Sequence, residues 1–137
     1  MKRLTRENYF MKMLDVIAER STCERKQVAA IIEKDGRIIS TGYAGSPSGM
    51  PHCIDEGCIM EDGHCVATIH AEANAIAFAA KHGIATQGAT LYCTYAPCRD
   101  CAKLIINSGI VAVKFVMPYS PGPLELLDKA GIFYEML

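Results

Sequence analysis

Apolar and polar positions alternate along this chain in two rhythms, one typical of helices and one typical of strands. From Thr5 to Arg20 the apolar residues return every three or four positions, which predicts an amphipathic helix with Thr5 as its N-cap. Val28–Glu33 and Arg37–Tyr43 read as strands, and the turn residues 34–36 between them predict a β-hairpin.

The second half of the chain alternates helices with strands. Such alternation predicts parallel pairing with right-handed crossovers, so with the hairpin the chain is expected to form an α/β fold around a mixed sheet of about five strands. The helices are expected over His70–Lys81, Cys98–Ser108 (ending at Gly109) and Pro123–Ala130, and the strands over Thr90–Tyr95, Val111–Met117 and Ile132–Met136.

One long segment, Ala44–Thr68, has almost no periodic pattern. Loops beyond about 12–15 residues are uncommon unless they are functional, disordered or cross-linked. This segment holds three cysteines and two histidines, so a cross-link is expected to hold it.

Length and charge narrow the possible functions. A chain of 137 residues, half of them hydrophobic, predicts a single domain spanning residues 1–137. Lys plus Arg total 14 and Asp plus Glu total 15, so the net charge is −1. A protein that binds nucleic acid usually carries a basic excess, so no nucleic-acid partner is expected.

The cysteine count and the absence of long apolar runs indicate a compartment. No apolar run approaches the ~20 residues of a membrane span, and the first ten residues are polar and charged. The chain has seven cysteines, an odd number, and no signal peptide is recognisable. Both observations argue against a secreted protein held together by disulfides. We therefore expect a soluble, cytoplasmic protein with reduced thiols and no membrane partner.

The strongest chemical motif is His70-Ala71-Glu72 followed by Pro97-Cys98-Arg99-Asp100-Cys101. One histidine and two cysteines give zinc three ligands and leave a fourth position open for water, which distinguishes a catalytic site from a structural one. Glu72 is then placed to move protons for that water. The pattern H-x-E…P-C-x-x-C is typical of zinc-dependent deaminases.

The two halves of this motif each stand at a predicted helix start. Cys98 and Cys101, three apart, would share one face of a first turn, where the helix dipole favours thiolates. Two helix N-termini would then meet at the carboxyl edge of the parallel strands, where open α/β sheets bind ligands. Alternatives remain: Cys98 and Cys101 could be a redox pair or half of a structural zinc site, but those readings leave His70 or Glu72 without a role.

Several segments in order resemble the deoxycytidylate (dCMP) deaminases, over essentially the whole chain. The similar stretches are 20–23 (RSTC), 42–47 (GYAGSP), 70–76 (HAEANAI), 97–103 (PCRDCAK), Tyr119, Leu126-Leu127 and Ala130-Gly131-Ile132. The resemblance implies the three-layer α-β-α cytidine deaminase-like fold. It also implies zinc-dependent hydrolysis of dCMP to dUMP, which supplies thymidylate synthesis. A homohexamer activated by dCTP and inhibited by dTTP is implied too, with Mg²⁺ accompanying the triphosphate.

The resemblance also assigns roles to individual residues. His70, Cys98 and Cys101 would hold zinc, and Glu72 would be the proton shuttle. Arg25 or Lys26 is the candidate for the substrate phosphate and Tyr119 for a substrate contact; the alternatives are a solvated face for the two cations and core packing for the tyrosine. The effector candidates are Gly42, Tyr43, Gly45, Ser46 and Gly49 of one loop, and Lys81, for which a solvated face is again the alternative.

Ala44 is a clear departure within that loop. Family members usually carry Asn there, and the amide is expected to hydrogen-bond the sugar of the ligand. Ala44 has no such group, so we expect weaker selectivity for the sugar.

The remaining cysteines suggest a second metal. Some family members carry a structural zinc with ligands at positions matching Cys23 and Cys53. The long loop offers Cys58 and either Cys65 or His64 to complete a closed tetrahedral site. The alternative is a set of reduced thiols in a loop. Cys93, in a predicted strand, is expected to be a buried thiol of the core.

Two rival functions remain beside a nucleotide deaminase. A polynucleotide deaminase acting on tRNA or single strands would need a basic or aromatic groove, which the charge balance opposes. A nucleotide-binding zinc protein without activity would have no need of Glu72.

Overall fold

The first helix and the hairpin form where the sequence pattern predicts them. The computed structural model describes all residues, 1–137. Helix α1 (Arg6–Ala18) begins after Thr5, whose Oγ1 accepts a hydrogen bond of 3.1 Å from the backbone N–H of Asn8. Strands β1 (Ala29–Lys34) and β2 (Arg37–Tyr43) pair antiparallel. Asp35 and Gly36 connect them with φ of 53° and 81°, as a tight hairpin turn requires.

The remaining strands extend this hairpin into the predicted mixed sheet of five strands. Its order is β2-β1-β5-β6-β7, with β1 antiparallel to β5 and with β5, β6 and β7 parallel. Helix α5 begins two residues earlier than predicted because prolines are tolerated in a first helical turn. Helix α5 spans Pro121–Lys129. The other elements of the second half agree with their predicted bounds within one residue: α3 (Ala71–Lys81), β5 (Thr90–Tyr95), α4 (Arg99–Asn107), β6 (Ala112–Met117) and β7 (Phe133–Met136).

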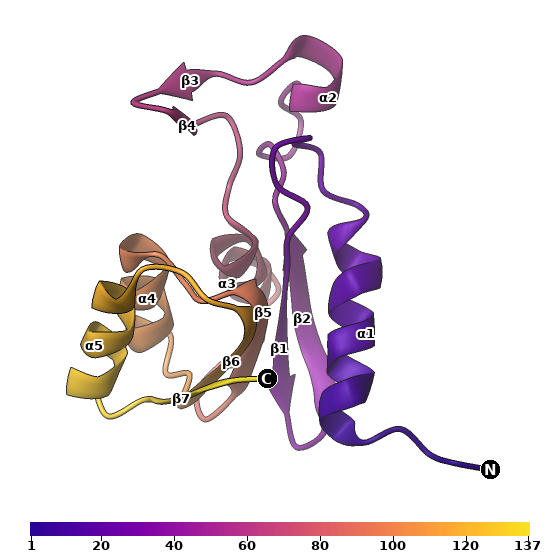
Figure 1. The fold of residues 1–137 in the computed structure, drawn as a ribbon, viewed down its shortest axis with the longest axis vertical. Coiled ribbons are helices and arrows are strands. Elements are labelled where there is room, and N and C mark those ends of the chain that lie inside the picture. Colours follow the sequence, from indigo (N-terminus) through magenta and orange to yellow (C-terminus); the bar gives the residue numbers. More distant parts are fainter.

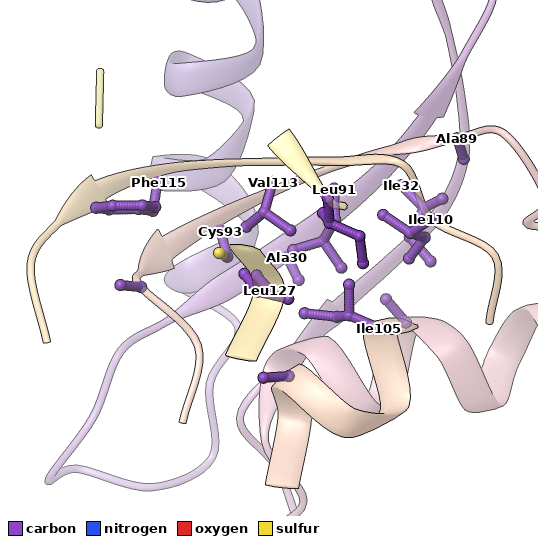
Figure 2. Packing of buried hydrophobic residues seen from close by; sticks show 14 of the residues in the cluster. Ala30, Ile32, Ala89, Leu91, Cys93, Ile105, Ile110, Val113, Phe115 and Leu127 are labelled. Atoms are coloured by element: carbon purple, nitrogen blue, oxygen red, sulfur yellow. The ribbon is translucent and has the colours of Figure 1, made fainter. Parts of the chain in front are cut away.

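Helices cover both faces of the sheet, so the molecule has the predicted α-β-α layers (Figure 1). In β1 the side chains alternate between the faces, with Ala29 and Ile31 packed beneath α1, and Ala30 and Ile32 in the larger core on the other side. Figure 2 shows this larger core, where Ile105 of α4 and Leu127 of α5 pack against the strands. The buried Cys93 belongs to it, as predicted.

The segment without periodic pattern contains three short elements, α2 (Cys53–Glu56), β3 (Met60–Glu61) and β4 (His64–Cys65). The sequence did not predict them because two to four residues are too few to show a period. They lie together beyond one end of the sheet (Figure 1). None of the helices has the length and apolar character needed to cross a membrane.

Candidate active site

Two helix N-termini bring a histidine and two cysteines together: His70, Cys98 and Cys101, here called the His70 group. His70 is the N-cap of α3 and Cys98 the N-cap of α4, while Cys101 lies in the first turn of α4. The Nδ1 atom of His70 is 3.4 Å from the sulfur of Cys98 and 3.5 Å from that of Cys101. Cys98 therefore precedes the helix instead of opening it, and Pro97 lies one position earlier still.

The donor set of this group fits zinc. One imidazole nitrogen and two sulfurs lie within 4.8 Å of one another, and nitrogen and sulfur are the donors that zinc takes in tetrahedral sites. Hydrogen bonding to Cys101 lowers the pKa of the Cys98 thiol to about 3, which favours the thiolate that a metal binds. His70 and Cys98 also border a cleft, so the group is open on one side.

Glu72 is the buried acid of this site. It stands in the first turn of α3 and is 9% exposed. Burial raises the pKa of Glu72, while the positive charge of His70 acts in the opposite direction. A raised pKa makes the carboxylate a stronger proton acceptor than an exposed glutamate, which suits a group that must take up and release a proton.

The cleft in front of this group, about 170 Å³ in volume, combines cationic and aromatic walls. All four residues predicted to face the substrate line it, together with His70 and Cys98: Arg25, Lys26, Ala44 and Tyr119. The Lys26 ammonium lies 5.6 Å from the centre of the Tyr119 ring and 5.9 Å from that of Tyr95. Such cation–π contacts orient the lysine side chain over the cleft.

Comparison with known proteins identifies the family. The sequence model of the cytidine and deoxycytidylate deaminase zinc-binding region matches residues 4–117. The chain belongs to the cytidine and deoxycytidylate deaminase family.

Individual relatives of this deaminase agree with that result. ComE operon protein 2 of Bacillus subtilis is 45% identical, over 100% of this chain and 74% of its own length. Deoxycytidylate deaminase of Enterobacteria phage T4 is 37% identical, over 85% of this chain and 82% of its own. The crystal structure of dCMP deaminase from the cyanophage S-TIM5 in complex with dCMP and dUMP has a TM-score of 0.88 at 31% identity and covers 100% of both chains. The resemblance and the fold predicted from the sequence are thus confirmed.

The predicted effector residues lie away from this cleft. Of the loop from Gly42 to Gly49, only Ala44, which is 5% exposed, lines it. Packing alone already requires a glycine at position 42: Gly42 faces α3, and a Cβ there would collide with the backbone of Ala71 and Ala75. Lys81 lies in the last turn of the 11-residue helix α3, about 15 Å along the axis from its N-terminus. Tyr43, Gly45, Ser46 and Gly49 do not line the cleft either.

Four cysteines form a second group in this deaminase. The sulfur of Cys23 is 3.7 Å from that of Cys58, and Cys53 is 3.6 Å from Cys65. All four sulfurs lie within 4.8 Å of one another, so they could hold one metal ion in a closed site. Of the two candidates for the last position, Cys65 belongs to this group and His64 does not; His64 lines the cleft instead.

Tyr95 and His64 line the cleft, but the sequence predicted no contact with the substrate for either residue. Tyr95 ends β5 at the carboxyl edge of the sheet, which is a signal for a ligand contact in an open α/β fold. His64 stands in β4, and no local pattern placed it near His70, because only the tertiary fold brings the hairpin there.

Proposed function

We propose that this deaminase hydrolyses dCMP to dUMP and ammonia. The observation that carries this proposal is one cleft that holds the His70 group, the buried Glu72 and the cations Arg25 and Lys26. Two of its relatives are named deoxycytidylate or dCMP deaminase, and one of these was crystallised with dCMP and dUMP. Residues 1–137 would form a single catalytic domain.

In this proposal His70, Cys98 and Cys101 hold the zinc ion. A neutral imidazole and two thiolates balance its charge. Zinc bound there supplies Lewis acidity, which makes water a competent nucleophile near neutral pH. Glu72 takes one proton from the attacking water and delivers it to the ring nitrogen. It then takes the second proton from the new hydroxyl group and delivers it to the amino group, which leaves as ammonia when the C–N bond breaks, so water and dCMP give dUMP and ammonia in balance.

The cleft walls would select the substrate. Arg25 or Lys26 binds the 5′-phosphate, and the two tyrosine rings beside Lys26 hold its ammonium in the cleft. Tyr119 contacts the nucleotide from the same wall. Ala44 offers the sugar no hydrogen bond, so the family's usual amide contact is absent.

We also propose a structural zinc on Cys23, Cys53, Cys58 and Cys65. Four sulfurs at these separations match a closed site. The metal would order a segment whose elements are too short to be stable alone. Metal analysis of active protein is expected to give two zinc ions per chain, and one per chain in fully active protein would refute this site.

Regulation and assembly rest on the family resemblance. We propose a cytoplasmic homohexamer, activated by dCTP and inhibited by dTTP with Mg²⁺, that supplies dUMP for thymidylate synthesis. The effector would bind outside the catalytic cleft, at Lys81 and the loop residues Gly42, Tyr43, Gly45, Ser46 and Gly49. Sedimentation with and without effectors tests the assembly.

A single set of assays tests the catalytic proposal. The protein is incubated with dCMP, deoxycytidine, dCTP and a cytosine-containing oligonucleotide, with and without dTTP, and loss of the amino group is followed. Turnover of dCMP that dTTP suppresses is expected. Turnover of the oligonucleotide alone would indicate a polynucleotide deaminase, and no turnover would indicate a nucleotide-binding protein without activity.

A further inference from the structure

His64 lies on a wall of the catalytic cleft without an assigned role. It stands in β4, its side chain is exposed, and it lines the same cleft as Lys26, His70 and Glu72. It does not belong to either group of possible metal ligands. An imidazole that faces a ligand cleft and binds no metal is free to contact the ligand.

The hairpin that carries His64 cannot hold its own position. Strands β3 and β4 have two residues each and pair only through Met60–Cys65 and Glu61–His64. A hairpin of this size is not stable alone in water, and the exposed Met60 adds no buried core. Other contacts must therefore fix it.

The four-cysteine group supplies those contacts. Cys65, the residue after His64, meets Cys53 of α2, while Cys58 meets Cys23 in the segment before β1. Cys23 and Cys65 also line the cleft. The group therefore joins the hairpin to the body of the domain directly at the cleft wall.

The charges around the cleft indicate what His64 would meet. Arg25, Lys26 and His64 line it, and Glu72 is the only carboxylate among the lining residues. Glu72 is buried at the His70 group, where the reacting amine must lie. The two cations of the cleft wall, Arg25 and Lys26, then favour an anion on the same small molecule.

We propose that His64 is a specificity-determining residue that donates an imidazole N–H to the 5′-phosphate of the substrate. The four-cysteine group is the positioning element that holds the imidazole at the cleft. This inference rests on the proposed function for the identity of the substrate. It gives the β3–β4 hairpin a direct part in substrate recognition, in addition to any contribution to the stability of the fold.

The test compares His64→Ala with His52→Ala, a matched control in the same segment whose side chain does not line the cleft. For His64→Ala we expect KM for dCMP to rise about 10- to 100-fold, as for one lost hydrogen bond to a charged group, with kcat changed less than about 2-fold. The ratio of kcat/KM for dCMP to that for deoxycytidine should fall by the same factor. His64→Gln, which keeps an N–H donor, should recover part of the loss, and His52→Ala should behave as the unmodified protein.

Binding separates this inference from the proposed reaction. Calorimetry with dUMP and deoxyuridine needs no turnover, so absence of dCMP deamination would refute the proposed function without deciding the role of His64. Equal weakening of both ligands by His64→Ala, or no weakening of dUMP, would overturn the inference.

The positioning role has its own test. Cys58 belongs to the cysteine group but does not line the cleft. Cys58→Ser should raise KM for dCMP as His64→Ala does, and the double variant should be no worse than either single one, because both act through the same imidazole. Additive losses in the double variant would refute the coupling.

Discussion

Gly42→Ala separates the packing role of this glycine from a role in ligand binding. Gly42 lies in β2 opposite α3, where an added Cβ would collide with the backbone oxygen of Ala71 and lie 2.6 Å from the backbone nitrogen of Ala75. Gly42 does not have a positive φ, so alanine would bring no backbone strain of its own. The collision is therefore the whole perturbation, and α3 must shift to relieve it.

The structure sets the size of the effect. An extra methyl group in a packed interior costs roughly 1–3 kcal/mol. The colliding atoms belong to the helix backbone, which cannot rotate away as a side chain can, so we expect the upper end, about 3 kcal/mol. This lowers the ratio of folded to unfolded protein roughly 150-fold and the unfolding midpoint by roughly 10 °C for a chain of this length. A shift of α3 would also displace His70, its N-cap.

The loss in free energy of unfolding is measured by urea titration, with unfolding monitored by circular dichroism and with the metal content matched between the proteins. The control is Gly45→Ala in the same chain segment, where the nearest atoms are side-chain atoms, Tyr43 Cε2 at 3.2 Å and Thr22 Oγ1 at 3.3 Å. Because those atoms can move, we expect a loss below about 1 kcal/mol there. Gly42→Ala should lower the urea concentration at the unfolding midpoint and leave the dependence of the unfolding free energy on urea concentration unchanged. A Gly42→Ala protein as stable as Gly45→Ala, but with an altered nucleotide response, would refute the packing argument.

Three further changes probe the site and the core. Glu72→Gln should lower kcat by about 10²- to 10⁴-fold and leave zinc content unchanged, because Glu72 is outside the His70 group; a proportional loss of zinc would contradict this. Ala44→Asn should lower KM for dCMP by supplying an amide at the cleft wall, and an unchanged KM would contradict the proposed sugar contact. Burial raises the pKa of Tyr92, so its stabilising effect is complete below about pH 10 and is lost as pH rises through the raised pKa. Absorbance titration should show one late-titrating tyrosine that Tyr92→Phe removes; an unchanged titration would contradict the assignment.

The sequence predicted the elements of the sheet because each carries a strong period. In β1, Ala29 to Ile32 are all buried, which marks a central strand, whereas β2 begins with the exposed Arg37 and lies at the edge. The short elements α2, β3 and β4 have no such signal. Their conformation follows from the cysteine contacts at their ends and not from their own pattern.

The chemical group of the site was predictable for a local reason. His70 with Glu72, and Cys98 with Cys101, each lie within one helical turn, so spacing alone placed them at helix starts. The cleft walls come from segments far apart in sequence, and their meeting depends on how the irregular segment packs at the end of the sheet. This is why the sequence offered His64 only as an alternative metal ligand and predicted no cleft contact for Tyr95.

The two groups of possible metal ligands border the same cleft but depend on metal differently. His70 and Cys98 are N-caps of helices packed on the sheet, so the packed core positions them. Cys58 and Cys65 lie in a segment with little buried surface, so their mutual contacts are the main restraint on it. Metal loss at the first group would therefore remove chemistry and leave the cleft walls in place. Metal loss at the second would leave the chemistry and release the cleft wall that carries His64. We therefore expect it to weaken substrate affinity, whereas metal loss at the His70 group should abolish turnover.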